Sequence, residues 1–213
     1  QTCIAPDYVL VHESKKEELI KALKNQMLMY YSEEASSSNS FGRLVNEKHC
    51  QRLVSAIELA KENGAIIEKG GVYNSADNFI EPTVISNLLD ESELLQEEIF
   101  GPILPIKTYK NIEEAVHYIN EKERPLALYI YSNNKKHIDY IINNTRSGGV
   151  CINTNAIHFS NHELPFGGVN NSGMGRAHGF FGFQDFSNQR AVLKSHSKGP
   201  LYLLFPPYNK FKQ

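Results

Sequence analysis

The sequence predicts an α/β fold in which helices cover both faces of a parallel sheet, a three-layer sandwich. Two observations support this class. Short apolar segments alternate along the chain with segments of helical periodicity, and this alternation is typical of parallel strands joined by helical crossovers. The segment at 126–131 is apolar throughout, as expected of a strand that is buried on both faces.

The first predicted elements are a strand at 8–11 and the helix that follows it. Ser14 and Glu17 have the spacing of a capping box, which would begin this helix. Its apolar residues recur every three or four positions and predict one buried face. These residues are Leu19, Leu23, Met27 and Tyr30. A serine-rich loop at 36–40 follows.

A second helix is expected between Asn46, which can cap its first turn, and Gly64, which ends it. Its predicted buried stripe consists of Leu53, Val54, Ile57 and Ala60. A short strand at 65–67 comes next. The segment at 79–85 contains Pro82. We expect it to be an edge strand or an irregular extended segment, because proline donates no hydrogen bond to a sheet.

The second half of the chain continues the alternation. The expected elements are a strand at 103–106, a helix capped by Asn111, a strand at 126–131, a helix at 134–144 and a strand at 150–152. From 154 to 175 the pattern stops. Loops of this length inside a compact domain are usually functional or disordered.

The last residues are predicted to form an arm. A final strand is expected at 190–193, followed by an extended tail that is rich in proline and aromatic residues. The chain would then consist of one domain at 1–189 and a C-terminal arm at 190–213.

The composition excludes several classes of protein. Hydrophobic residues make up 41% of the 213 residues and charged residues 22%, which excludes collagen, low-complexity disorder and a disulfide scaffold. No apolar run approaches the ~18 residues of a membrane span. A net charge of −2 predicts no binding to nucleic acid. Three cysteines, an odd number, favour free thiols in a reducing compartment, and we expect a cytoplasmic protein.

Cys3 is the first residue that can carry chemistry. An ordinary thiol, with a pKa near 8.5, is only about 3% ionised at pH 7. A nucleophilic cysteine therefore needs a neighbouring cation, dipole or base, and the adjacent sequence supplies none. A buried structural cysteine is the alternative interpretation. Cys50 and Cys151 are both predicted to be core residues.

A second candidate is the segment in which Glu97 and Glu98 run directly into Ile99, Phe100 and a Gly-Pro turn. A carboxylate held there can accept two hydrogen bonds from a diol such as ribose. The ring of Phe100 can lie against the flat face of a cofactor. The alternative is a pair of solvated surface carboxylates.

The third candidate is the glycine-rich segment at 164–176. It has neither the spacing of a dinucleotide fingerprint nor that of a Walker motif. We therefore predict a packed loop that walls a substrate pocket. His178 follows this loop and can cap a helix or approach the pocket, with ordinary hydrogen bonding as the alternative. The eight histidines show no metal-ligand spacing, so no metal site is predicted.

Three stretches together resemble the aldehyde dehydrogenase superfamily. They are QTCIAPDY at 1–8, QEEIFGP at 96–102 and LPFGG at 164–168, in the family's order and roughly its spacing. RPLALY at 124–129 and NSGMG at 171–175 resemble its class 3, fatty-aldehyde-type branch. The resemblance weakens in the tail. It implies the catalytic domain of such an enzyme without the cofactor domain, and NAD(P)-dependent oxidation of an aldehyde to a carboxylic acid.

The resemblance also implies roles for particular residues. Cys3 would attack the aldehyde as a thiolate, hydride would pass to NAD or NADP, and water would hydrolyse the resulting thioester. The backbone N–H of Cys3 would donate to the oxyanion. Glu98 would hold the nicotinamide ribose, with Phe100 near the nicotinamide. The residues implied for the substrate pocket and its supporting loop are Asn153, Phe166, Gly167, Gly168 and His178.

Members of the family carry the dinucleotide-binding domain, the general-base glutamate and an oxyanion asparagine before the cysteine. The resemblance therefore implies that the 213 residues alone have no NAD-dependent activity. It also implies that 190–193 pairs with a hairpin of that domain and with a partner subunit, in a homodimer of the whole enzyme. On the isolated chain this strand would be a bare edge and an aggregation risk.

Two other functions stay open. One is a truncated, non-enzymatic module used for oligomerisation or binding. The other is a thiol-acylating, CoA-dependent aldehyde dehydrogenase, which the class 3-like motifs disfavour. The gene region upstream of Gln1 discriminates the enzyme from the truncated module.

Overall fold

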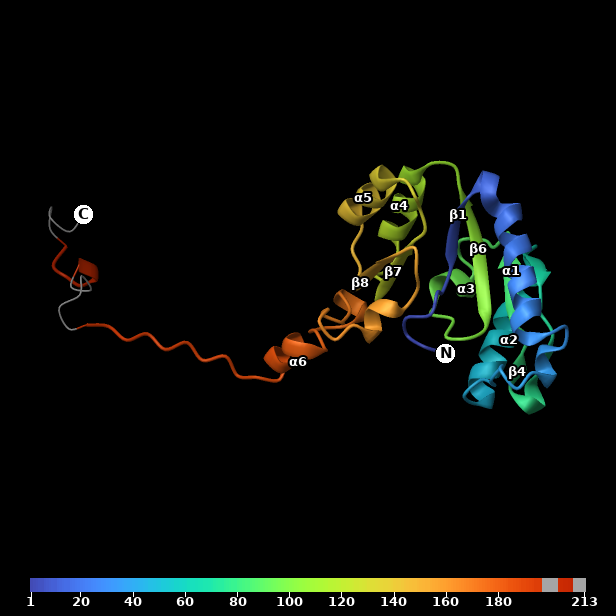
Figure 1. Ribbon diagram of the computed structural model, residues 1–213, viewed down its shortest axis with the longest axis horizontal. Helices are drawn as coiled ribbons and strands as arrows, with labels where there is room; N and C mark the ends of the chain where they lie inside the picture. The colour runs from blue at the N-terminus through green and yellow to red at the C-terminus, as the bar shows by residue number, and fades with distance from the viewer. Residues whose placement is uncertain (197–202, 209–213) are drawn as a thin grey trace.

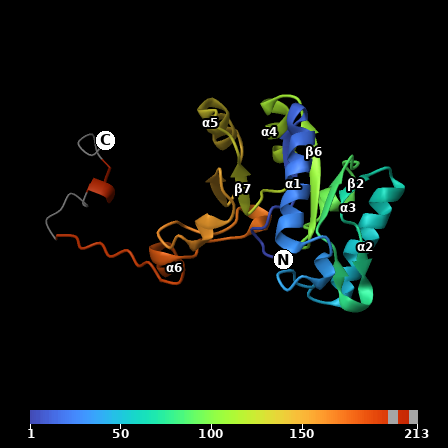
Figure 2. The same ribbon diagram turned by 45° about the vertical axis from the view of Figure 1, so that its right-hand side comes forward.

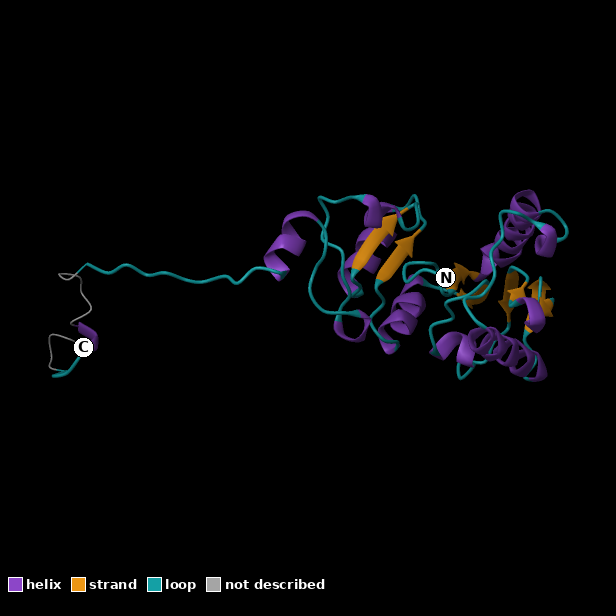
Figure 3. Ribbon diagram, turned by 90° about the horizontal axis from the view of Figure 1, so that it is seen from below, coloured by secondary structure: helices purple, strands orange, loops and turns teal. Residues whose placement is uncertain are grey.

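The computed structural model describes residues 1–196 and 203–208. The first part of the chain is built on a four-stranded sheet with the order β1-β6-β5-β2. β1 (Val9–His12), β6 (Ile103–Tyr109) and β5 (Thr83–Ser86) run parallel, and β2 (Ile66–Lys69) is antiparallel to β5. Figure 3 shows helices on both sides of this sheet. The predicted α/β class with a mainly parallel sheet is confirmed.

The two long helices, α1 (Lys16–Tyr31) and α2 (Glu47–Glu62), stand on opposite sides of the four-stranded sheet (Figures 2 and 3). α2 begins and ends as predicted: Asn46 Oδ1 accepts the N–H of His49 at 2.9 Å, and Gly64 follows with a φ of 87°. Its inner face packs on β5, β6 and the short helix α3 (Glu93–Gln96). The largest buried residues of this core are Leu53, Ile57, Ile80, Ile85, Leu94 and Ile99.

The start of α1 differs from the prediction. Ser14 lies in a 3-10 turn (Glu13–Lys15), and its Oγ is 2.8 Å from Nδ1 of His12. The predicted capping box with Glu17 is therefore wrong, because α1 begins two residues beyond Ser14 and has no side-chain cap. Ile20 is the one fully buried residue of α1, whereas Tyr30 is 63% exposed.

Of the two alternatives for 79–85, the edge strand is wrong, and the irregular extended segment fits the break at Pro82. Pro82 lies between β4 (Phe79–Ile80) and β5, so every residue of β5 keeps its N–H and β5 can occupy a central position. β4 pairs instead with β3 (Tyr73–Asn74) in a separate ribbon.

The second part of the chain contains α4 (Ile112–Glu121), β7 (Ala127–Ile130), α5 (Lys135–Asn144) and β8 (Gly149–Ile152). β7 and β8 form a parallel pair separate from the larger sheet, with α4 and α5 beside them (Figure 1). Burial of β7 on both faces was expected, and this is wrong. Ile130 is its one buried residue, and α5 buries none.

The region from 154 to 178 has only two 3-10 turns, Ile157–Ser160 and Asn170–Ser172, as the loss of periodicity predicts. His178 occupies the cap position of α6 (Gly179–Asp185), but its side chain makes no capping bond. Beyond α6, residues 186–196 run away from the body of the molecule (Figure 1).

The structure has no strand at 190–193; these residues are exposed and extended. A strand needs a hydrogen-bonded neighbour, and no described residue pairs with this segment. Much of the predicted tail, 197–202 and 209–213, lies outside the described residues. The boundary after 189 stays a prediction. No helix in the described ranges has both the length and the apolar character to cross a membrane.

Candidate functional site

Cys3 lies in a tight turn that precedes β1. The N–H of Ala5 donates to the carbonyl of Thr2 at 3.0 Å, so Cys3 and Ile4 are the two central residues of this turn. The Ile4 side chain is 8% exposed, whereas Cys3 is exposed. Cys3 is therefore not the buried structural cysteine of the alternative interpretation. The local fold turns its thiol toward solvent by burying its neighbour.

The other two thiols are buried, as predicted for core residues. Cys50 belongs to the core beneath α2 and is 0% exposed. Cys151 lies in β8 and is 6% exposed. Among the three free thiols, Cys3 alone is exposed.

Side chains of the N-terminal segment anchor it to the backbone of distant segments. The Gln1 amide donates to the Arg43 carbonyl and accepts the N–H of Val45, both at 2.9 Å. Farther along, Asp7 Oδ1 accepts the N–H of Ile99 at 2.9 Å. The segment that carries Cys3 is thereby fixed to the segment that carries Glu98 and Phe100.

The backbone of Glu98, Ile99 and Phe100 is held by α2. One guanidinium nitrogen of Arg52 donates to the carbonyls of Glu98 (3.0 Å) and Ile99 (2.8 Å), and Nε2 of His49 lies 2.9 Å from the Phe100 carbonyl oxygen. Ile99 is 2% exposed, so its burial directs the side chains on either side outward. Glu98 is exposed and Phe100 is 38% exposed. The Glu98 carboxylate forms no ion pair or side-chain hydrogen bond within the described residues.

Asp7 also reports the electrostatic coupling of the two segments. Burial raises the pKa of the Asp7 carboxyl, and the hydrogen bond from Ile99 opposes this change. The negative charge of Glu98 raises the pKa further, and the positive charge of Arg52 lowers it. The Asp7 carboxyl, four residues beyond Cys3, is thus influenced by both Glu98 and Arg52.

The glycine-rich loop is tightly folded on itself. A Cβ on Gly167 would overlap the carbonyl oxygen of Gly175, and one on Gly168 would overlap the carbonyl of Ser172. Nη1 of Arg176 donates to the Gly168 carbonyl at 2.6 Å. These glycines allow backbone segments to approach where no side chain fits. The loop is packed, as the sequence predicts, while its role as a pocket wall stays a prediction.

Phe166 and His178 meet at the end of this loop. Their rings stack with centroids 5.4 Å apart and an interplanar angle of 17°, and Phe159 lies edge-on to both. The backbone of Phe166 pairs with that of Ala177, which brings the two ends of the loop together. Nδ1 of His178 is buried and has no partner in the described part of the chain.

Asn153 ties the ends of β7 and β8 together. Its φ is 56°, its N–H donates to the Ile130 carbonyl at 2.8 Å, and its amide both accepts from and donates to the backbone of Ser132, at 2.9 and 3.1 Å. Asparagine tolerates the left-handed conformation better than most residues. Asn153 therefore joins the end of β8 to the end of β7, while its role in supporting a substrate loop stays a prediction.

Sequence reasoning missed a buried pair behind this region. Nδ1 of His158 lies 3.0 Å from Sγ of Cys151, and the His158 side chain is 8% exposed. Burial lowers the pKa of His158 and so favours its neutral form. The histidines show no metal-ligand spacing, and the sequence predicts no role for His158. No local signal relates a strand residue to a loop residue seven positions later, because the contact depends on the path of the loop.

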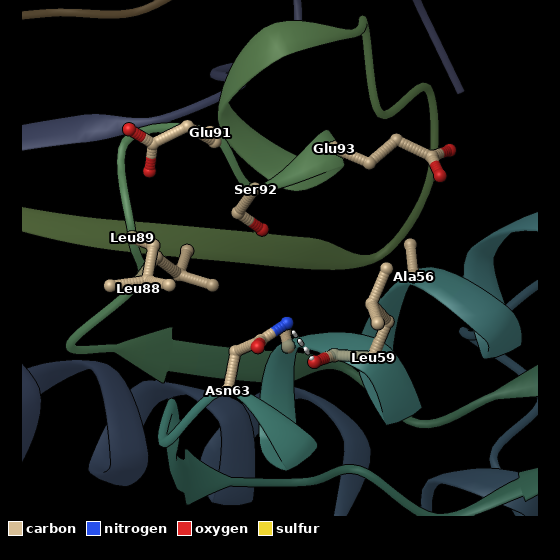
Figure 4. Close-up of a pocket in the computed structure, with 9 residues that line it drawn as sticks. Ala56, Leu59, Asn63, Leu88, Leu89, Glu91, Ser92 and Glu93 are labelled. Atoms are coloured by element: carbon tan, nitrogen blue, oxygen red, sulfur yellow. Dashed lines mark hydrogen bonds between the residues drawn. The ribbon is translucent and has the colours of Figure 1, made fainter.

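Hollows elsewhere on the surface contain none of the predicted site residues. Figure 4 shows the lining of one such hollow, between α2 and the loop before α3. Its volume is about 90 Å³, and its lining consists of apolar residues and of Asn63, Glu91, Ser92 and Glu93. Another, of about 230 Å³, is lined partly by Lys16 and Lys107. Within the described residues no three potential metal ligands form a cluster.

Comparison with known proteins identifies the family. The sequence profile of the aldehyde dehydrogenase family matches residues 1–192. The 4,4'-diaponeurosporen-aldehyde dehydrogenase of Staphylococcus aureus is 41% identical over 213 residues, which is 100% of this chain and 46% of that protein. Aldehyde dehydrogenase family 3 member A2 of Rattus norvegicus is 42% identical over 100% of this chain and 43% of its own length.

Solved structures agree with the sequence relatives. The substrate bound state of Staphylococcus aureus AldH has a TM-score of 0.85 and 40% identity, and the match covers 100% of this chain and 46% of that chain. The succinate-semialdehyde dehydrogenase of Burkholderia pseudomallei has a TM-score of 0.79 at 31% identity, over 87% of this chain and 39% of that one. The chain spans about half the length of the relatives that it matches. It belongs to the aldehyde dehydrogenase family.

Proposed function

We propose that the complete gene product oxidises an aldehyde to a carboxylic acid with NAD or NADP, and that Cys3 is its nucleophile. The main support is the exposed thiol in an anchored turn, with both other thiols buried. An exposed catalytic thiol also fits a reducing compartment such as the cytoplasm. Because the relatives are about twice as long as the shared stretch, the proposal concerns the whole gene product.

In this reaction the Cys3 thiolate adds to the carbonyl carbon, a C–S bond forms, and the carbonyl π electrons move to oxygen. The backbone N–H of Cys3 donates to that oxyanion. A bound dinucleotide supplies the acceptor for the hydride that leaves the same carbon. Water then attacks the thioester on Cys3, releases the carboxylic acid and restores the thiol.

Glu98 and Phe100 fit the ribose end of a dinucleotide. Glu98 offers an exposed carboxylate without a protein partner, and two such oxygens can accept hydrogen bonds from the two ribose hydroxyls. Phe100 offers a partly exposed ring beside it. Arg52 and His49 hold the backbone of both residues. The backbone therefore need not rearrange when the two side chains bind the dinucleotide.

The proposed nucleophile is tested by Cys3→Ser in the complete gene product. Straight-chain aldehydes such as hexanal and hexadecanal are offered with NAD and with NADP. We expect kcat to fall about 10³-fold or more, because serine is far less ionised than cysteine. Cys50→Ala is the matched control and retains turnover. Undiminished turnover by Cys3→Ser refutes the assignment.

The same assay separates the remaining candidate functions. Free carboxylic acid as the product supports hydrolysis of the thioester, whereas a CoA thioester formed when CoA is added identifies the acylating reaction. No turnover of any aldehyde by the wild-type gene product would favour the non-enzymatic module.

The proposed homodimer is tested by light scattering. A Mus musculus relative, 42% identical over 193 residues, is named a dimeric, NADP-preferring aldehyde dehydrogenase. A mass of twice the complete gene product supports the dimer, and a monomer contradicts it.

A further inference from the structure

A tyrosine of β7 forms a hydrogen bond to the turn that contains Cys3. The hydroxyl of Tyr129 donates to the carbonyl oxygen of Ile4 at 2.5 Å, across 125 positions of sequence. The next N–H, that of Ala5, donates to the Thr2 carbonyl at 3.0 Å. The peptide unit between Ile4 and Ala5 is thus held at both its oxygen and its nitrogen.

This peptide unit closes the turn around Cys3. A peptide plane rotates as a rigid body, since only the dihedrals on either side of it are soft. Rotation of the plane after Ile4 would break both hydrogen bonds and change the backbone on which the Cys3 thiol and N–H are placed. The bond from Tyr129 therefore restricts the direction of the thiol.

We propose that Tyr129 is a positioning residue, whose hydroxyl fixes the turn that directs Cys3 toward the substrate carbonyl. This inference rests on the proposed role of Cys3 as nucleophile. Misplacement of a reacting group by about 1 Å can cost on the order of 10²-fold in rate.

The tyrosine itself is held firmly. Tyr129 lies opposite Cys151 in the parallel pair β7–β8, and its ring is 6.2 Å from that of His158 in an edge-on contact. Nδ1 of His158 lies within hydrogen-bond distance of Sγ of Cys151. Burial raises the pKa of the Tyr129 phenol, so the hydroxyl keeps its proton and remains a donor at neutral pH.

Tyr131 provides a matched control two residues farther along the chain. It is 65% exposed, and its hydroxyl donates to Oδ1 of Asn155 at 2.8 Å instead of to the turn. Replacement by phenylalanine removes one hydroxyl at either position. At 129 it removes the bond to the Ile4 carbonyl and a backbone hydrogen bond from Ala156, and at 131 it removes the bond to Asn155. Of these bonds, the one to Ile4 holds the Cys3 turn.

The test compares Tyr129→Phe with Tyr131→Phe in the complete gene product, with hexanal and NAD or NADP as substrates. We expect Tyr129→Phe to lower kcat about tenfold and to leave KM within about twofold, because the lost bond orients the nucleophile and does not bind substrate. Tyr131→Phe keeps the wild-type kcat. Native-state alkylation with iodoacetamide, read by mass spectrometry, serves as the fold control, since Cys50 is 0% exposed.

Two results would overturn the proposal. One is a kcat for Tyr129→Phe equal to that of Tyr131→Phe. The other is labelling of Cys50 in Tyr129→Phe, because the hydroxyl would then support the fold as a whole. Cys3→Ser separates this inference from the proposed function: if that variant stays active, the nucleophile assignment itself fails. If it is inactive and the tyrosine variants are equal, only the positioning role fails.

Discussion

The region built on the four-stranded sheet and the region built on β7–β8 have the same strand-and-helix pattern but very different burial. In the first, Leu53, Ile57 and Ile85 are all 0% exposed. In the second, α5 has no buried residue, and Val150 and Ile152 of β8 are 37% and 44% exposed. Alternation in the sequence therefore predicts the mainly parallel strand-and-helix arrangement of both regions, but it does not predict how tightly each region is packed.

The candidate site lies where the two regions meet. Asp7 bonds the N-terminal segment to Ile99 of the first region, and Tyr129 bonds it to β7 of the second. The first region holds the backbone of Glu98 and Phe100, and the ring cluster around Phe166 belongs to the second region. Reactive groups are commonly carried by loops that a rigid scaffold positions. Here the N-terminal segment that carries Cys3 is bonded to both regions, and the two regions differ in how many of their residues are buried.

The largest expected difference between the regions is the cost of truncating a leucine. Leu53→Ala removes a fully buried side chain from the first region and should lower the free energy of unfolding by about 3 kcal/mol. Leu128→Ala removes a half-buried side chain from β7 and should cost about 1 kcal/mol. Urea denaturation measures both values. Equal losses would mean that the two regions are packed alike.

A smaller effect is expected in the glycine-rich loop of the second region. The new methyl group of Gly168→Ala would overlap the Ser172 backbone, which cannot move aside as a flexible side chain can. We expect a loss of about 2 kcal/mol and faster hydrogen exchange in the loop. Gly42→Ala is the control, since its methyl group would meet no atom within 4 Å. A wild-type hydrogen-exchange pattern in Gly168→Ala would show that the loop accommodates the added methyl group without rearrangement.

The smallest effect concerns the bond that holds the N-terminal segment to the first region, through the pH dependence of stability. The native pKa of Asp7 is raised above its ordinary value of 3.8, so the folded state binds this proton more tightly than the unfolded state. Its contribution to stability is present below pH 3.8 and is lost as the pH rises through the native pKa. Asp7→Asn can still accept the Ile99 N–H, so the stability difference between variant and wild type should shift in the variant's favour with rising pH.

Thermal unfolding between pH 3 and pH 7 measures this difference. Asp139→Asn, which changes an exposed side chain of α5, is the matched control and should follow the wild-type curve. A difference between Asp7→Asn and wild type that is constant with pH would contradict the raised pKa that burial gives Asp7 in the folded state.

Local sequence was enough to predict the helix starts at Asn46, Asn111 and Asn134. In each case the side chain accepts an N–H two or three residues ahead, and such a bond needs nothing from the rest of the chain. The motifs around Cys3, Glu98 and Gly167 were enough to indicate the family, because they depend on residue identity and order.

Long-range packing decided the rest. The central position of β5, the exposed face of β8, the Cys151–His158 pair and the bond from Tyr129 to Ile4 all join segments whose approach depends on the path of the chain between them. Periodicity reports which face of an element is apolar, but it does not report which neighbour covers that face or whether one does. For this reason the tertiary structure, and not the motif, shows how Cys3 is held.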